Sequence, residues 1–202
     1  MVPPAVLERS RLLVQPAMVA AVDRLCVELR LPSRYHFGWT EVYGSPSNAG
    51  SRKGLRTARA LHPTEAVGAA GAAAGRGAVA AELVHHCSLV QDDIIDGDTM
   101  RRNRPTVWSA FGVEDEVISG DALHNLAYQV LLDEPTPERV SAATRLATAT
   151  AAMIAGQAAD MAFDDMADID LEACLAMEAD KKGALLGYSA SVGAVLAGAP
   201  GG

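Results

Sequence analysis

The stretch Leu-Val-Gln-Asp-Asp-Ile-Ile-Asp-Gly-Asp at residues 89–98 joins the end of an apolar run to three carboxylates, Asp92, Asp93 and Asp96. On a helix Asp92 and Asp96 project from one face, one turn apart, with Asp93 beside them. Like charges this close repel one another unless a cation lies between them. Carboxylate oxygens suit Mg²⁺, which keeps several waters and is shared with substrate phosphates. The stretch therefore predicts a magnesium site at the end of a long helix.

A basic block follows at once, Thr-Met-Arg-Arg-Asn-Arg-Pro-Thr at residues 99–106. It supplies Arg101, Arg102 and Arg104, and Pro105 closes the loop that carries them. The planar guanidinium fork matches phosphate oxygens bidentately. Carboxylates followed by arginines predict a site for a metal ion and a diphosphate.

The composition favours an all-α protein. Half of the 202 residues are apolar but only 4% are aromatic, and alanine, the best helix former, dominates. This length is enough for one domain with a sizeable core. The net charge of −8 argues against a nucleic-acid partner, which would need a basic surface.

The three cysteines are scattered without metal-ligand spacing, which indicates a reducing compartment, and we expect a cytoplasmic protein. We expect no signal peptide, because residues 1–14 hold two prolines and charges before any long apolar core. We also expect no transmembrane segment. The most apolar run, residues 183–198, is shorter than the ~20 residues that a span needs.

Apolar periodicity and breaker residues predict the order of the elements. Thr136 can cap a helix that has Pro137 at its first position. The expected helices cover residues 5–30 with an interruption at Pro16, 78–98, 114–132, 137–163, a segment ending near Lys181 and Lys182, and 183–198. The expected loops cover residues 31–50, an alanine-glycine connector at 68–77, and an acidic loop at 164–170.

Several sequence blocks, in the order in which they occur along the chain, resemble those of the trans-isoprenyl diphosphate synthase (polyprenyl synthetase) family, and of geranylgeranyl diphosphate synthases in particular. The aspartate stretch resembles the family's first aspartate-rich motif, and the arginine block resembles the basic block after it. The cationic segment at residues 51–56 resembles a Gly-Gly-Lys-x-x-Arg-Pro block in which the glycine pair and the proline are replaced. The other matching positions are His85, Gly120-Asp121, Gly156-Gln157 and Lys181. The resemblance covers residues 50–199.

The resemblance implies a helical bundle around a central apolar cavity and a role for each matching residue. Asp92, Asp93 and Asp96 would bind the magnesium ions that bridge an allylic diphosphate, which Arg101 would also hold. Gln157 and Lys181 would lie by the same allylic site. The diphosphate of isopentenyl diphosphate would be held by Lys53, Arg56, His85 and Arg102.

The implied activity is a magnesium-dependent prenyl transfer that lengthens an allylic diphosphate by five carbons to an all-trans prenyl diphosphate. Product length in this family is gated by bulk just before the first motif. Here those positions are Ser88 and Cys87, both small, so we expect a product of twenty carbons, and Cys87→Phe should shorten it. The family also implies a homodimer.

The sequence departs from the family pattern at the second aspartate-rich motif. The family's second aspartate-rich motif lies downstream of the lysine that Lys181 resembles, and this chain stops before it. The segment 164–168 also fits Asp-Asp-x-x-Asp, but it precedes Lys181 and is typical of a solvated loop. We therefore expect one partial domain, with N-terminal helices and a loop at 1–49, a substrate-binding core at 50–199, and the C-terminal helices missing.

Three explanations remain open for the short chain: a fragment, a naturally short protein completed by a partner subunit, or a protein that has lost activity. The alternative functions are a non-catalytic or regulatory subunit of a full-length synthase and a terpene cyclase of the same fold. A cyclase has no use for an isopentenyl site, so Lys53, Arg56 and His85 favour chain elongation.

Overall fold

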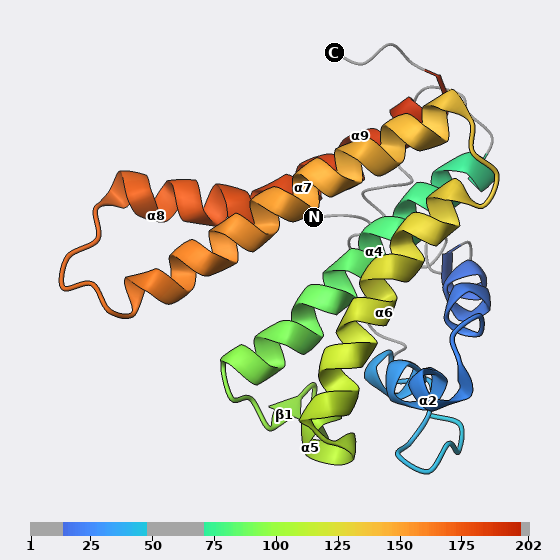
Figure 1. Cartoon of the computed structure of the whole chain (residues 1–202), viewed down its shortest axis with the longest axis horizontal. Helices are drawn as coiled ribbons and strands as arrows, with labels where there is room; N and C mark the ends of the chain where they lie inside the picture. The colour runs from blue at the N-terminus through green and yellow to red at the C-terminus, as the bar shows by residue number, and fades with distance from the viewer. Residues whose placement is uncertain (1–13, 48–70, 199–202) are drawn as a thin grey trace.

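The computed structural model describes residues 14–47 and 71–198 (Figure 1). They form a bundle of helices with one two-stranded hairpin, which confirms the predicted all-α class. The central helix, α4 (Gly71–Ile95), packs against α6 (Val113–Leu132) and α9 (Ala184–Leu196). The longest helix, α7 (Pro137–Phe163), packs along α9 and also contacts α6.

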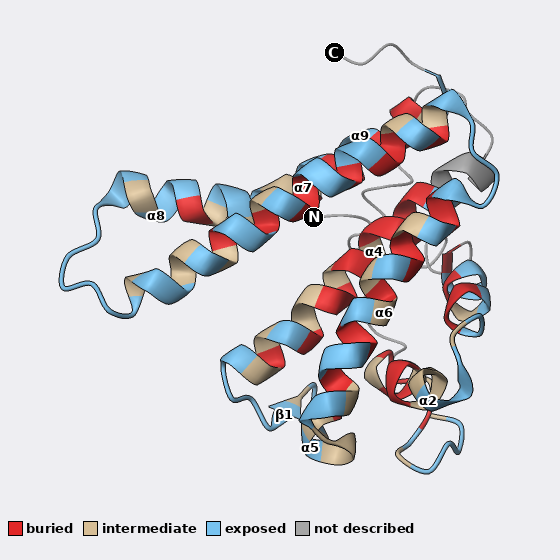
Figure 2. Ribbon diagram, viewed as in Figure 1, coloured by how far each residue is buried: buried red, intermediate tan, exposed pale blue. Residues whose placement is uncertain are grey.

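The central position of α4 follows from its small and apolar residues, because neighbouring helices can pack on several of its sides. Figure 2 shows the middle of α4 as mostly buried, with intermediate and exposed residues toward its end at Ile95. A Cβ on Gly77 would lie 2.7 Å from Cγ2 of Val192, so α9 can approach α4 this closely only because the residue is glycine. The predicted connector at 68–77 is therefore wrong from residue 71 onward, since its small residues serve helix packing. The helix also ends earlier than expected, at Ile95 rather than Asp98.

The junction of α6 and α7 agrees with the sequence. The Thr136 side chain accepts a hydrogen bond from the Arg139 amide, and Pro137 occupies the first turn, as predicted. The Arg139 guanidinium reaches back and donates to the carbonyls of Leu131 at 2.6 Å and Val130 at 3.1 Å. It thereby satisfies backbone acceptors that the end of α6 leaves without helical partners.

The N-terminal part differs from the prediction. A helix covers residues 14–22 and passes through Pro16. The interruption lies instead at residues 23–26, which form a turn between this helix and the next. The helix α2 (Val27–His36) then runs through Pro32, where a loop was expected. Its last turn buries Tyr35 against α5 and the hairpin, and this packing outweighs the cost of an internal proline.

The arginine block forms a tight hairpin of β1 (Met100–Arg101) and β2 (Arg104–Pro105), followed by the short helix α5 (Val107–Phe111). The two turn residues, Arg102 and Asn103, have φ values of 55° and 61°. Two consecutive residues with positive φ are typical of the turns that suit the twist of a hairpin. The turn therefore fixes the direction in which the arginines leave the backbone.

The chain returns through α8 (Leu171–Glu178), which forms an exposed arm with the end of α7 (Figures 1 and 2). No break follows α8. A π-helical turn, η2 (Ala179–Gly183), connects it to α9, so the predicted helix end near Lys182 is wrong. No helix in the described part of the chain is long and apolar enough to cross a membrane.

Candidate active site

The carboxyl-terminal end of α4 borders a cavity of about 560 Å³. Its walls come from α4, α7, η2 and the start of α9, with one residue from α6. Most of the lining is apolar, and the polar residues that line it include five that the sequence analysis discussed: His85, Ser88, Asp92, Gln157 and Lys181. The structure therefore brings together residues that lie up to 96 positions apart in the chain.

Asp92 is the half-buried carboxylate of this cavity. Burial raises its pKa; Lys181 opposes the shift, and the negative charge of Asp96 adds to it. Asp96 is exposed one turn later, where its amide donates to the Asp92 carbonyl at 2.8 Å. Two carboxylates at this spacing repel each other, so a cation placed between them would be stabilised.

The opposite wall depends on a close contact between two backbones. A Cβ on Gly156 would lie 2.7 Å from the Lys181 Cα, so α7 can meet the π turn only at a glycine. The Lys181 ammonium forms an ion pair with Asp160 of α7. Burial lowers the pKa of Lys181, but Asp160, Asp92 and Asp96 together outweigh burial and raise it. Lys181 is thus a firmly charged group that faces the aspartates.

The two small residues before the motif have different environments. Ser88 lines the cavity and donates to the His85 carbonyl at 2.8 Å. Cys87 instead lies in the hydrophobic core and is absent from the cavity lining, and burial raises its pKa to about 12. Of the two residues, only Ser88 lines this cavity, and the expectation that they gate product length stays a prediction.

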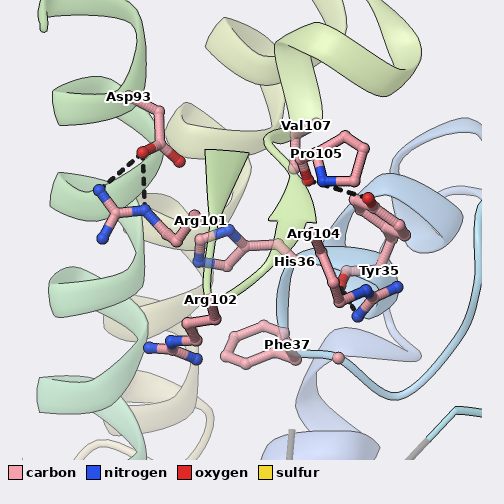
Figure 3. Close-up of a pocket in the computed structure, with 10 residues that line it drawn as sticks. Tyr35, His36, Phe37, Asp93, Arg101, Arg102, Arg104, Pro105 and Val107 are labelled. Carbon is pink, nitrogen blue, oxygen red and sulfur yellow. Dashed lines mark hydrogen bonds and ion pairs between the residues drawn. The ribbon is translucent and has the colours of Figure 1, made fainter. Parts of the chain in front are cut away.

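Asp93 faces the other side of α4 and is fully buried. Its Oδ1 accepts a hydrogen bond from Nε of Arg101 at 2.6 Å and forms an ion pair with Nη2 of the same guanidinium, also at 2.6 Å (Figure 3). Its Oδ2 has no hydrogen-bond partner within the described residues. Burial raises the pKa of Asp93, and Arg101 opposes that shift. Asp93 and Arg101 border a second pocket of only about 30 Å³, which is room for little more than water.

Two residues that the sequence analysis did not single out hold this side together. Glu116 in the first turn of α6 is fully buried and accepts a hydrogen bond from the Trp108 amide. The Trp108 indole donates to the carbonyls of Asp93 at 3.2 Å and Asp98 at 2.9 Å. Burial raises the pKa of Glu116 to about 7, and the Trp108 amide opposes the shift. An acidic residue in a first helical turn normally indicates a solvated position, so the sequence held no signal for this one.

The three predicted metal ligands stay a prediction, and the structure divides them between two sides of α4. Within residues 14–47 and 71–198, no three carboxylates, histidines or cysteines converge on one point. Asp93 is held by Arg101 on the far side of the helix, which leaves Asp92 and Asp96. Magnesium commonly takes only one or two protein carboxylates and completes its shell with waters and substrate phosphates. A pair of this kind therefore fits the ion.

The remaining predicted residues divide into three groups. Arg101 and Arg102 line the small pocket rather than the large cavity. Lys53 and Arg56 lie outside the described residues. Residues 164–168 form an exposed loop as expected, and Asp170 after it caps α8 by accepting from the Ala173 amide at 2.7 Å.

The family resemblance implied an apolar cavity, and the structure has one that Asp92 and Lys181 line. Comparison with known proteins decides whether the chain belongs to the family. A model of the family described as polyprenyl synthetase matches residues 47–201. The chain belongs to the polyprenyl synthetase family. The cavity described above therefore lies in a member of the polyprenyl synthetase family.

Similarity to individual proteins supports the same family. The chain is 44% identical over 188 residues to (2E,6E)-farnesyl diphosphate synthase of Mycobacterium tuberculosis, covering 93% of this chain and 52% of the relative. It is 34% identical over 198 residues to geranylgeranyl diphosphate synthase of the same organism, covering 96% and 56%. The solved polyprenyl synthetase from Streptomyces coelicolor A3(2) superposes with a TM-score of 0.93 at 44% identity, over 97% of this chain and 58% of that one. The chain thus spans about half the length of the curated relatives it matches.

Proposed function

We propose that this chain carries the first half of the active site of a magnesium-dependent prenyltransferase. The reaction condenses isopentenyl diphosphate with an allylic diphosphate to an all-trans prenyl diphosphate. The observation that supports this most strongly is the cavity itself, in which Asp92, Gln157 and Lys181 gather at an otherwise mostly apolar space of about 560 Å³. That volume suits a prenyl chain with its charged end at the aspartates.

Asp92 and Asp96 would hold magnesium, because Asp92 lines this cavity and Asp96 lies exposed one helical turn later. Bound magnesium would neutralise charge on the departing diphosphate. Lys181 adds a fixed positive charge facing Asp92, and Gln157 adds a neutral polar group beside it. The apolar walls would keep water away from the allylic cation that remains.

The isopentenyl diphosphate would be held by Arg102 and His85 among the described residues, with Lys53 and Arg56 from the cationic segment. His85 lines the large cavity and Arg102 lines the small pocket, so this site would extend between the two. Arg101 keeps a proposed role toward the allylic diphosphate, although its guanidinium is also bonded to Asp93. Retention of isopentenyl-site residues favours chain elongation over a cyclase.

The test is product analysis. The purified chain is incubated with Mg²⁺, isopentenyl diphosphate and geranyl or farnesyl diphosphate, and the products are separated by chromatography. We expect longer prenyl diphosphates that are lost in Asp92→Asn/Asp96→Asn. The matched control is Asp164→Asn/Asp168→Asn, which makes the same charge change in the same motif pattern on an exposed loop. Equal loss in both variants, or a cyclic hydrocarbon product, would contradict the proposal.

For product length we propose twenty carbons, supported by the small Ser88 on the cavity wall. The relatives named above include a farnesyl and a geranylgeranyl synthase, so the same chromatogram decides between fifteen and twenty carbons. Ser88→Phe should shorten the product by at least one five-carbon unit. Cys87→Phe should instead overpack the core and lower the melting temperature. An unchanged product from folded Ser88→Phe protein would remove Ser88 from this role.

A second candidate is a subunit that needs a partner to complete the cavity. It is supported by an apolar rim whose side chains line the cavity yet are 43–57% exposed, namely Ile95, Val117, Ile154 and Met161. A partner helix could cover this rim and supply further carboxylates. Activity that develops only when a full-length synthase is added, with co-elution on size exclusion, would favour this function. A homodimer remains a prediction from the family resemblance, and a cytoplasmic location remains a prediction from the cysteine pattern.

A further inference from the structure

The carboxylate of Asp96 is placed only by the backbone that carries it. Asp96 is exposed, and within the described residues its side chain makes no hydrogen bond or ion pair. Its amide donates to the Asp92 carbonyl at 2.8 Å, and the next residue, Gly97, has a φ of 67°, which is typical of a helix end. We term residues 93–98, which end α4, the aspartate turn. The direction of the Asp96 side chain depends on how firmly this turn is held.

The side chain of Trp108 in α5 holds the aspartate turn at both of its ends. Its indole nitrogen donates to the Asp93 carbonyl at 3.2 Å and to the Asp98 carbonyl at 2.9 Å. The Asp98 amide donates to the same Asp93 carbonyl at 2.9 Å, which closes the turn. Asp96 lies between the two residues that the indole contacts. The ring nitrogen of one side chain therefore fixes the backbone segment that carries Asp96.

Trp108 is in turn anchored to α6. Its backbone amide donates to the fully buried carboxylate of Glu116, and α5 packs on α6. The buried Thr106 just before α5 adds a second side-chain bond, because its hydroxyl also donates to the Asp98 carbonyl, at 2.9 Å. Since α6 packs along α4 as well, the aspartate turn is attached to the same helix that supports the rest of α4. This arrangement sets the position of Asp96 relative to α4.

The arginine hairpin has a separate attachment, to α2 and the segment after it. The Tyr35 hydroxyl donates to the Pro105 carbonyl at 2.9 Å (Figure 3). The Arg104 guanidinium lies 4.2 Å from the centre of the Tyr35 ring and donates to the Thr40 carbonyl at 2.7 Å. None of these contacts involves the indole. Loss of the indole donor would therefore loosen the aspartate turn and leave these attachments of the hairpin in place.

We propose that Trp108 is a positioning residue for the magnesium ligands, which holds Asp96 one helical turn beyond Asp92 so that both carboxylates reach one ion. This rests on the proposed function, in which Asp92 and Asp96 bind the magnesium that bridges the allylic diphosphate. Trp108 acts through backbone carbonyls and does not touch the ligand. Without its donor, the Asp96 carboxylate samples directions that do not meet the ion. Diphosphate then loses affinity that magnesium supplies and keeps the affinity that the arginines supply.

The experiment measures binding of inorganic diphosphate to the full chain by isothermal titration calorimetry, with and without Mg²⁺. The ratio of the two affinities, which we term the magnesium gain, reports on the aspartates. The variant is Trp108→Phe, which keeps an aromatic ring and removes the donor. Trp39→Phe is the matched control, because it makes the same change in the other tryptophan of the chain, whose ring stacks on Phe37 with centroids 4.5 Å apart.

We expect Trp108→Phe to lower the magnesium gain about tenfold, the lower end of what loss of a ligand-orienting partner costs in metal affinity. Binding without magnesium should change less than about twofold, because the hairpin keeps its own attachments. Trp39→Phe should match the parent chain in both measurements. Thr106→Val removes the other side-chain donor to the Asp98 carbonyl and should lower the magnesium gain about threefold, the size of one weak hydrogen bond.

A double variant separates positioning of Asp96 from a general structural role. In the Asp96→Asn background the carboxylate that Trp108 positions is already gone. Adding Trp108→Phe should therefore change the remaining magnesium gain less than about twofold, because the two residues act in series. A packing defect that reaches the whole site would lower the gain of Asp96→Asn by the same factor as that of the parent chain.

Three results would overturn the proposal. They are a parent-like magnesium gain in folded Trp108→Phe protein, equal weakening with and without magnesium, and the full further loss in the Asp96→Asn background. If Trp108→Phe does not fold, a parent-like magnesium gain in Thr106→Val overturns it instead. Failure of the proposed function looks different: Trp108→Phe would lower the magnesium gain, yet the parent chain would form no prenyl product. A parent chain without any magnesium gain refutes both.

Discussion

Asp92 and Asp93 are neighbours in the chain, yet they have opposite environments. Asp92 faces a cavity of about 560 Å³ and is attracted by Lys181 across it. Asp93 is fully buried on the other side of α4, where the Arg101 guanidinium binds its Oδ1 through a hydrogen bond and an ion pair. We term the Asp92 side of α4 the open side and the Asp93 side the closed side. On the open side the carboxylate is available to a ligand, whereas on the closed side it is bound to the hairpin through Arg101.

The difference shows that one motif can serve two purposes. On the closed side the bonds among Asp93, Arg101, Trp108 and Glu116 fix the hairpin to α4 and α6. On the open side Asp92 and Asp96 repel each other and gain nothing from the protein alone. Substitutions on the closed side should therefore cost stability, and substitutions on the open side should cost binding.

The largest effect is expected for Asp93→Ala. It removes one partner of a buried ion pair, which typically costs about 3–5 kcal/mol because a charge is left unpaired. The free energy of unfolding in urea checks this, with Asp164→Ala on the exposed loop as the control, expected within about 0.5 kcal/mol of the parent. Parent-like stability of Asp93→Ala would mean that Asp93 is not a structural residue.

The next effect concerns pH. The pKa of Glu116 is raised to about 7 from 4.5, so the folded chain holds this proton more tightly than the unfolded chain. The stabilisation is present below about pH 4.5 and is lost as the pH rises through 7. Glu116→Gln should flatten thermal stability between pH 5 and 8 and gain up to about 3 kcal/mol at the upper end.

The control for that measurement is Glu114→Gln, an exposed residue in the same helical turn, which should leave the pH profile unchanged. A profile that stays as steep in Glu116→Gln as in the parent would exclude Glu116 as its source.

A smaller effect is expected for Gly156→Ala on the open side. The added Cβ would meet backbone atoms of Asp180 and Lys181, which cannot move without shifting the π turn. We expect about 2 kcal/mol of destabilisation by overpacking and weaker magnesium-dependent diphosphate binding, because Lys181 is displaced. Gly75→Ala is the control, since nothing lies within 4 Å of its Cβ and alanine favours a helix. Equal effects in both variants would contradict the contact.

The smallest effect on stability is expected for Asp92→Asn. The raised pKa of Asp92 means that its charge is unfavourable in the folded chain, so removing the charge should leave stability within about 1 kcal/mol or increase it slightly. The same change should weaken magnesium-dependent binding of an allylic diphosphate at least about tenfold. Calorimetry of unfolding and of binding together test this. A large loss of stability would mean that the two sides of α4 are alike.

The sequence predicted those features that depend on residues close together in the chain. The helix at 137–163 and its Thr136 cap are confirmed. The resemblance assigned Gln157 and Lys181 to the allylic site and His85 to the isopentenyl site, and the structure places all three on the lining of one cavity. It did not predict which way Asp93 and Cys87 point, because helix rotation is set by α6 and the hairpin. His36 fell in an expected loop, and the sequence held no local signal for its contact with His86, fifty residues away.

The π turn at Ala179–Gly183 has a consequence for sequence register. A π turn holds one residue more than the α-helical turn it replaces, and each residue of a helix advances its faces by about 100°. Deleting a single residue here would restore a regular helix and rotate α8 relative to α9 by roughly that angle. The backbone would stay helical while Lys181 turned away from Asp92. A one-residue gap at this point in an aligned sequence would therefore mark a protein that folds alike but presents a different residue to the cavity.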